Sequence, residues 1–208
     1  MELESRSDYP GTSAPAKSVL IIACGALARE ILAIKQANGL DHVTLTCLRA
    51  SLHATPEQIP DAVRQAIRKH RDQYDTILIG FGDCGTGGLL DKVLAEEGAE
   101  RIEGAHCYAF FTGVDEFSAA EEDDLGTFYL TDFLARQFDA MVYRPLGLDR
   151  YPELRDMYFA HYTRVVYLAQ FRDAQLEKKA AAAADKLGLP LEIRYTGYGD
   201  LATFVGSA

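Results

Sequence analysis

The sequence predicts an α/β fold built on a parallel, or mostly parallel, sheet with helices on both faces. In the first half of the chain, short apolar runs alternate with longer segments whose apolar residues recur at helical spacing. The first run, 18–24, is continuously apolar, which is typical of a strand buried on both faces. The 208 residues, 48% hydrophobic and 25% charged, suit one globular domain with a sizeable core.

Each expected element of the first half has its own local reason. Leu27, Ile31 and Ile34 recur at helical spacing after the first strand, and Gly39 closes that helix. A capping box at 55–58 then opens the next helix. The expected elements are a strand at 18–24, a helix at 26–38, a strand at 42–48, a helix from 55 to about 73, a strand at 75–80, a helix at 87–97 and a strand at 99–107.

The second half is less regular. We expect a short strand at 126–131, a helix at 133–141, one or two helices within 152–187, and a last strand at 191–195. Residues 1–17 are polar and predict a disordered lead. Residues 18–208 then form a single domain, Rossmann-like or flavodoxin-like, with right-handed connections.

The composition excludes several classes of function. The formal net charge of −10 argues against a nucleic-acid partner, because phosphate binding needs clustered Lys and Arg. No apolar run reaches the roughly 18 residues of a membrane helix, and no secretion signal is evident. The expected compartment is the cytoplasm, where thiols stay reduced, so four cysteines favour metal binding or catalysis over disulfides.

Three of the cysteines stand at the ends of predicted strands. Cys24, Cys84 and Cys107 each occur where a strand runs into a turn rich in glycine or small residues. Because the carboxyl ends of parallel strands share one edge of the sheet, these thiols are expected to converge. Any one of them alone would be interpreted as a small buried hydrophobic residue. Cys47, inside the second strand, keeps that interpretation.

A tetrahedral zinc site needs a fourth ligand, and two histidines compete for the role. His53 follows the second strand on the same sheet edge and is the first choice. His106 is the second, because its neighbour Cys107 points to the opposite face in extended chain. His161 is expected to be a hydrogen-bonded core residue. Zinc is favoured, but three thiolates also suit a [4Fe–4S] cluster with one open iron, and the sequence does not choose.

The glycine-rich loop around Cys84 carries further candidates. Gly82 and Gly85, with Gly25 after the first strand, would let backbone approach a cofactor closely. Asp83 is the candidate catalytic residue, orienting a ligand or donor beside the metal. The run G-F-G-D-C-G at 80–85 also fits a dinucleotide fingerprint. That match is disfavoured, because the first glycine lies inside the strand and Asp83 would face a pyrophosphate.

With these residues in view, the chain resembles a bacterial and archaeal family catalogued as domain of unknown function 1638. The similar stretches are I-A-C-G-A-L at 22–27 with Glu30, L-H at 52–53 with Pro56, G-D-C-G at 82–85, G-L at 88–89, and Cys107 followed by Phe110, Phe111 and Gly113. The family usually has an acidic residue before the third cysteine, where this chain has His106, which leaves the fourth ligand open. Family genes often neighbour corrinoid-dependent methyltransferases and their reactivation factors, which implies a role in one-carbon metabolism.

These observations lead to three functional hypotheses. The first is a metal-dependent methyltransferase in which a thiolate-bound metal activates a thiol or methyl-transfer substrate, with a corrinoid in possible contact. The second is a non-enzymatic metal or corrinoid carrier, or an assembly factor, serving a corrinoid methyltransferase protein. The third is an iron–sulfur protein in electron transfer. A small-molecule substrate or the methyltransferase protein is the expected partner, with no nucleic acid and no membrane.

Overall fold

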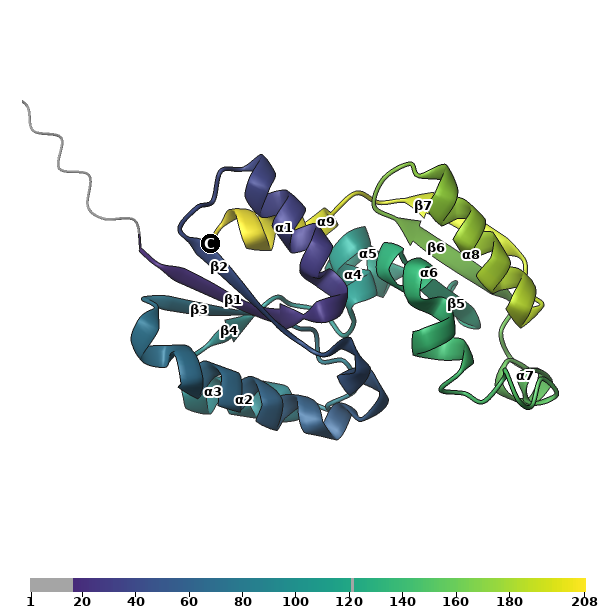
Figure 1. Ribbon diagram of the computed structural model, residues 1–208, viewed down its shortest axis with the longest axis horizontal. Coiled ribbons are helices and arrows are strands. Elements are labelled where there is room, and N and C mark those ends of the chain that lie inside the picture. Colours follow the sequence, from purple (N-terminus) through teal and green to yellow (C-terminus); the bar gives the residue numbers. More distant parts are fainter. Residues whose placement is uncertain (1–16, 121) are drawn as a thin grey trace, which may run out of the picture.

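The structure, a computed structural model, has an α/β architecture in which parallel strands form two sheets flanked by helices (Figure 1). It describes residues 17–120 and 122–208, so the disordered lead expected at 1–17 lies, apart from its last residue, outside the described residues. The predicted fold class is confirmed. The strands divide between two sheets, however, where a single sheet was expected.

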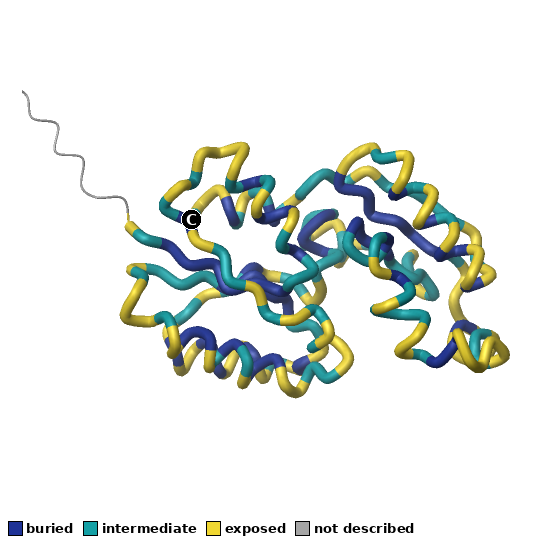
Figure 2. The backbone as a smooth tube through the Cα atoms, viewed as in Figure 1, coloured by how far each residue is buried: buried dark blue, intermediate teal, exposed yellow. Residues whose placement is uncertain are grey.

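The first sheet has the strand order β2-β1-β3-β4 and is parallel throughout. Its strands are β1 (Val19–Cys24), β2 (Val43–Leu48), β3 (Thr76–Gly80) and β4 (Glu100–Arg101). Side chains of β1 alternate between two apolar clusters, so both faces of this strand are buried (Figure 2). Helices α1 (Ala28–Ala37) and α9 (Gly199–Gly206) cover one face, while α2 (Ile59–His70) and α3 (Leu89–Glu97) cover the other.

The second sheet has the order β5-β6-β7 and is also parallel. Its strands are β5 (Thr127–Thr131), β6 (Arg164–Ala169) and β7 (Leu191–Tyr195). Helices α6 (Asp132–Phe138) and α8 (Ala174–Leu187) pack on it around Leu130, Val165 and Tyr167, and α7 (Leu154–Tyr158) lies at its far end (Figure 1).

The chain joins the two sheets twice. After β4 it forms α4 (Cys107–Thr112) and α5 (Val114–Ala119), which lie between the sheets, and after β7 it returns as α9 to the first sheet (Figure 1). Leu201 and Val205 of α9 are fully buried against α1 and α4. Strand β1 runs from the edge of the molecule to its middle, so its carboxyl end faces the second sheet.

Two expectations about elements are wrong. The segment 152–187, expected to be helical, contains the strand β6 (Arg164–Ala169), because all of its residues after Arg164 are buried and it has the adjacent β-branched Val165 and Val166. The fourth strand, expected at 99–107, is only Glu100–Arg101, so Cys107 begins a helix instead of ending a strand.

Smaller details also differ. The side chain of Thr55 makes no capping hydrogen bond, and a short 3₁₀ turn, Pro56–Gln58, precedes α2. No helix in the described ranges is long and apolar enough to cross a bilayer.

Candidate functional site

The predicted cysteines lie where the first sheet ends, on the side that faces the second sheet. Cys24 is the last residue of β1, Cys84 lies in the loop after β3, and Cys107 is the first residue of α4. All of the cysteines are free thiols. Cys24 and Cys84 therefore lie at the carboxyl-end edge of the first sheet, as their positions after strands predicted. Cys107 lies at the start of α4, the helix that follows β4.

Cys24 and His53 are in direct contact. The Cys24 Sγ and the His53 Nε2 are 3.3 Å apart, and the backbone N–H of Ala26 donates to the same sulfur at 3.4 Å. Cys24 is only 2% exposed, and burial raises the pKa of its thiol to about 12. His53 comes from a 3₁₀ turn, Ala50–Ala54, that follows β2, as the sheet-edge argument predicted.

Cys84 occupies an unusual backbone conformation. Its φ is +52°, and no other non-glycine residue in the described ranges has a positive φ. This left-handed conformation costs free energy in a residue with a Cβ, and such residues cluster at functional sites. Burial raises the pKa of the Cys84 thiol to about 11.

Cys107 lies within electrostatic range of the other two thiols. Burial is the main cause of its raised pKa, and the charges of Cys84 and Cys24 raise it further. Cys47, inside β2 and exposed, contributes only weakly to the raised pKa of Cys24. We call Cys24, Cys84, Cys107 and His53 together the thiol site.

His106, the alternative fourth ligand, is exposed and precedes α4. Burial lowers the pKa of His53, and the charge of His106 lowers it further. His53 contacts a thiol in this structure, whereas no hydrogen bond from the His106 side chain is found in the described part of the chain.

The thiol site fits a metal only in part as it stands. Among residues 17–120 and 122–208, no three His, Cys, Asp or Glu side chains are gathered closely enough to hold an ion. The 3.3 Å between Cys24 Sγ and His53 Nε2 does match the edge of a tetrahedral zinc site, which is roughly 3.6 Å for bonds of ~2.3 and ~2.0 Å. A metal bound by all four residues would therefore require Cys84 and Cys107 to change their side-chain positions, and a change of χ1 rotamer moves a cysteine sulfur by about 3 Å.

The candidate glycines and Asp83 hold the loops around this site in place. A Cβ on Gly82 would lie 2.9 Å from the Gly104 oxygen, and one on Gly25 would lie 3.0 Å from the Leu48 oxygen. Gly85 has a φ of +85° and lies beside Pro56. Close contacts between chain segments thus account for glycine at 25 and 82, and the backbone conformation accounts for it at 85; their cofactor contacts stay a prediction.

Asp83 is engaged within its own loop. Its carboxylate accepts hydrogen bonds from Thr86 Oγ1 at 2.7 Å and from the N–H groups of Gly88 at 2.8 Å and Gly87 at 3.1 Å. Desolvation alone would raise the pKa of Asp83, but these hydrogen bonds hold it below its usual range. The carboxylate therefore organises the loop that carries Cys84, and its catalytic role stays a prediction.

A cavity of about 580 Å³ lies at the start of α4, although none of the four thiol-site residues lines it. His106 and Tyr108, the neighbours of Cys107 in sequence, line it together with Tyr129 of β5 and His161. His161 was expected in the core of a helix. It is exposed instead, because it lies in the turn before β6. The aromatic lining suits a ligand with a large apolar surface.

Comparison with protein families gives a match over most of the chain. The family described as "Protein of unknown function (DUF1638)" matches residues 47–205. The chain belongs to this family. The DUF1638 match covers His53, Cys84 and Cys107 but begins after Cys24. No curated protein and no solved structure matches the chain.

The sequence reasoning on this DUF1638 chain missed a buried polar group between the two sheets. Glu30 of α1, which is 4% exposed, faces Arg136 of α6, and Asp132 at the start of α6 is fully buried. One signal was present, because Glu30 lies three residues after Leu27 and one before Ile31, on the apolar side of its helix. A charge at such a position needs a partner from elsewhere in the fold.

Proposed function

We propose that this DUF1638 protein binds one metal ion, with zinc favoured, through Cys24, Cys84, Cys107 and His53. We propose further that the bound metal activates a substrate thiol for methyl transfer, in metabolism that uses corrinoid methyl carriers. The main support for the proposal is the contact between Cys24 and His53 at the carboxyl end of the first sheet. The electrostatic coupling of Cys107 to Cys24 and Cys84 supports it.

The protein's own residues have separable roles in this proposal. Cys24 is held rigidly at the end of the central strand, and Cys84 is held by the loop that Asp83 organises. The Cys84 N–H donates to the Ala105 oxygen at 2.8 Å, which ties this loop to the segment that leads into Cys107. The ligands therefore come from segments that constrain one another, as a site built by the fold requires.

A metal held by several thiolates lowers the pKa of a coordinated substrate thiol and supplies a nucleophile at neutral pH. In the transfer, a carbon–sulfur bond forms as the bond between methyl and the corrinoid cobalt breaks. The corrinoid leaves with the electron pair, and the proton of the thiol passes to solvent. The cavity lined by Tyr108, Tyr129, His106 and His161 offers apolar surface for a methyl donor at the start of α4, next to Cys107 in the sequence.

The proposal places the protein in the cytoplasm, with a corrinoid methyltransferase protein as its partner. Four free cysteines support a reducing compartment. A carrier or assembly factor would use the same metal site without turnover, and an iron–sulfur protein would fill it with a cluster. Both alternatives are outcomes of the experiment below.

The test is metal analysis of the protein purified without oxygen, together with its visible spectrum. We expect about one zinc per chain and no absorption near 400 nm, and we expect Cys84→Ser and Cys107→Ser to lose most of the metal. Cys47→Ser is the matched control, because Cys47 is an exposed thiol on the neighbouring strand and should keep full metal.

Full metal in both site variants, or no metal in the wild type, would contradict the metal site. Bound iron with a broad visible band would favour the cluster. Bound zinc without methyl transfer from a methylated corrinoid to a thiol would favour the carrier. Circular dichroism of each variant shows whether lost metal reflects a lost ligand or a lost fold.

A further inference from the structure

A buried carboxylate and a partly buried guanidinium from the two halves of the molecule face each other without a hydrogen bond between them. Glu30 Oε1 lies 3.8 Å from Arg136 Nη1, which is too far for a hydrogen bond. Glu30 Oε2 and Arg136 Nη1 are both buried, and neither has a hydrogen-bond partner in the part of the chain that the structure describes. Native proteins rarely leave such atoms unpaired, so each instance calls for an explanation.

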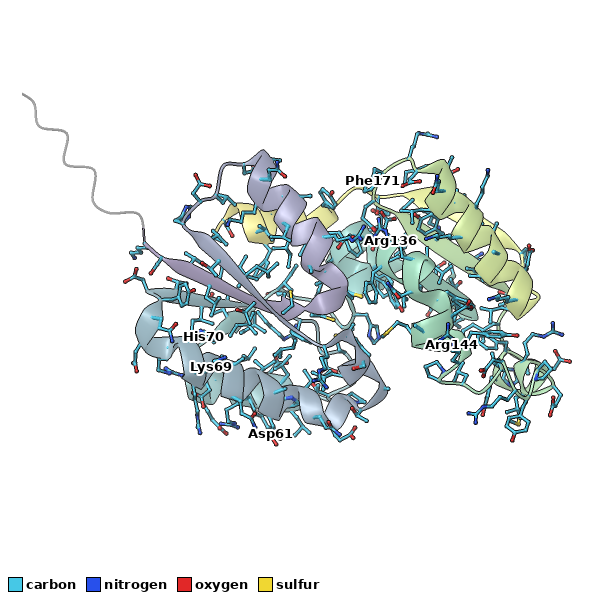
Figure 3. The ribbon with its side chains drawn as sticks, in the orientation of Figure 1. Asp61, Lys69, His70, Arg136, Arg144 and Phe171 are labelled. Atoms are coloured by element: carbon cyan, nitrogen blue, oxygen red, sulfur yellow. The ribbon has the colours of Figure 1, made fainter. Side chains whose placement is uncertain are left out.

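The other terminal nitrogen of the Arg136 guanidinium already has a partner within its own half of the molecule. Its Nη2 lies 3.4 Å from Asp132 Oδ2, and the Asp132 carboxylate accepts from the Tyr167 hydroxyl at 2.6 Å and from the Gln170 N–H at 3.3 Å. This network anchors Arg136 to the second sheet while Glu30 belongs to the first. Figure 3 shows Arg136 in the middle of the molecule, where the two halves meet.

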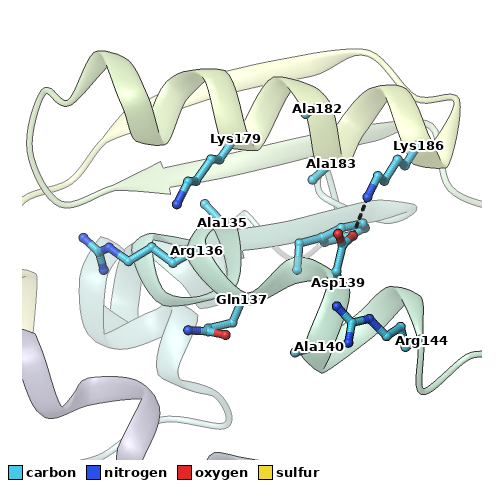
Figure 4. A pocket seen from close by; sticks show the side chains of 11 residues that line it. Ala135, Arg136, Gln137, Asp139, Ala140, Arg144, Lys179, Ala182, Ala183 and Lys186 are labelled. Carbon is cyan, nitrogen blue, oxygen red and sulfur yellow. Dashed lines mark hydrogen bonds and ion pairs between the residues drawn. The ribbon is translucent and has the colours of Figure 1, made fainter.

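Arg136 also borders a groove of about 350 Å³ between α6 and α8. Figure 4 shows its side chain extending away from the ion pair of Lys186 and Asp139, which lies at the other end of that groove. The other charged residues of the groove therefore do not bind the guanidinium. Its Nη1 remains available to a group that lies between the two halves of the molecule.

The two unpaired atoms need opposite kinds of hydrogen-bond partner. Glu30 Oε2 is an acceptor that needs a donor, and Arg136 Nη1 is a cationic donor that needs an acceptor. A group that carries an ammonium and a carboxylate a few ångströms apart satisfies both at once, with charge-assisted hydrogen bonds to each. The α-ammonium and α-carboxylate of an amino acid have this arrangement.

The thiol site is close to this pair. Glu30 follows Cys24 by six residues of mostly helical chain, a rise of about 9 Å, and α6 contacts the turn Gly25–Leu27 that begins at Cys24. The charge of Glu30 also contributes to the raised pKa of Cys107, after burial and the charges of Cys84 and Cys24. A side chain of two carbons and a sulfur extends about 4 Å from the Cα of an amino acid, and the Glu30 side chain leans toward the amino end of its helix, so the two together cover most of that distance.

We propose that Glu30 and Arg136 bind the ammonium–carboxylate head of a thiol-bearing α-amino acid, whose sulfur reaches the thiol site. This inference rests on the proposed function and names its substrate class. Glu30 and Arg136 are substrate-binding residues in this account, and they come from different halves of the molecule, so the bound amino acid bridges the two sheets.

The test is calorimetric titration of the purified protein with a set of small probes. L-homocysteine carries both charges and the thiol, 4-mercaptobutanoate lacks the ammonium, 3-mercaptopropylamine lacks the carboxylate, and L-2-aminobutyrate lacks the thiol. We expect L-homocysteine to bind about tenfold or more tightly than each of the others. Glu30→Gln and Arg136→Gln should each lose that advantage, whereas Arg29→Gln, which removes an exposed charge from the same helix as Glu30, should keep it.

The possible results distinguish failure of the head-group site from failure of the proposed thiol chemistry. If every thiol probe binds equally well, water satisfies the Glu30–Arg136 pair and the head-group site is refuted, while the metal site stands. If L-2-aminobutyrate binds as tightly as L-homocysteine and both depend on Glu30, the head-group site stands and the thiol chemistry fails. The comparison of probes on the wild-type protein keeps the inference testable even if a variant does not fold.

Discussion

Replacing Gly199 by alanine should break the attachment of α9 to the first half of the molecule. A Cβ at this position would lie 2.4 Å from the Phe110 oxygen and 2.5 Å from the Phe111 oxygen, both of them backbone atoms of α4. These distances are well short of van der Waals contact, and backbone atoms in a packed helix have little room to yield. Either α9 or α4 must therefore move.

The expected cost follows from what α9 buries. Leu201 and Val205 are fully buried, and each contributes about 1.5–3 kcal/mol relative to exposure. A partial loss of both, with the strain of a side chain at a φ of +48°, should cost at least about 3 kcal/mol. Gly197→Ala is the matched control. Its φ is +64° and nothing lies within 4 Å of the added Cβ, so it should cost only about 1 kcal/mol.

Urea unfolding followed by circular dichroism measures both variants, because the midpoint and slope give the free energy of unfolding. Since Cys107 begins α4, Gly199→Ala should also weaken metal binding, whereas Gly197→Ala should not. Equal stability of the two variants, within about 0.5 kcal/mol, would show that α9 and α4 are not in close backbone contact at Gly199.

The remaining predictions concern the strained cysteine and an acidic ion-pair network. Cys84→Gly should be more stable than Cys84→Ala by about 0.5–1 kcal/mol in urea, because glycine accepts a positive φ without strain; a more stable alanine variant would contradict the strain at Cys84. Desolvation alone would raise the pKa of Asp124, but hydrogen bonds from Arg194, Tyr129 and Arg164 hold it at about 2. Because this pKa is depressed on folding, the stabilisation is present above the unfolded value of about 4 and is lost as the pH falls through about 2. Asp124→Asn should therefore cost about 2 kcal/mol at pH 7, and progressively less below about pH 4, when unfolding is measured across that range; a cost that does not change with pH would contradict the assignment.

Much of the first half was predictable because local patterns there agree with the tertiary structure. Strands β1 and β3 are apolar runs that end at a turn, β2 alternates apolar residues with threonine, and the helices between them have apolar faces. The strand β6 was missed because its residues Val165 and Leu168, with Tyr162 before them, are spaced three apart and also fit a helix. What selects the strand is pairing with β5 and β7, which are distant in sequence.

The candidate site, like the fold, was predictable only in part. The positions of Cys24 and His53 follow from a rule about strand ends, so residue order was enough to bring them together. Arg136 beside Glu30 depends on how the second sheet docks against the first, and no local pattern encodes that docking. The helical start at Cys107 depends on the early end of β4, which pairs with β3 at only two positions.

X-ray absorption at the metal edge of the protein purified without oxygen measures directly whether Cys24, Cys84, Cys107 and His53 bind zinc. We predict one zinc with three sulfur ligands at about 2.3 Å and one nitrogen ligand at about 2.0 Å, and one sulfur fewer around the small fraction of zinc that Cys84→Ser retains. A nitrogen that disappears in His53→Ala but not in His106→Ala would identify the fourth ligand. A first shell with no more than one sulfur, or an edge spectrum unchanged in Cys84→Ser and Cys107→Ser, would contradict the account.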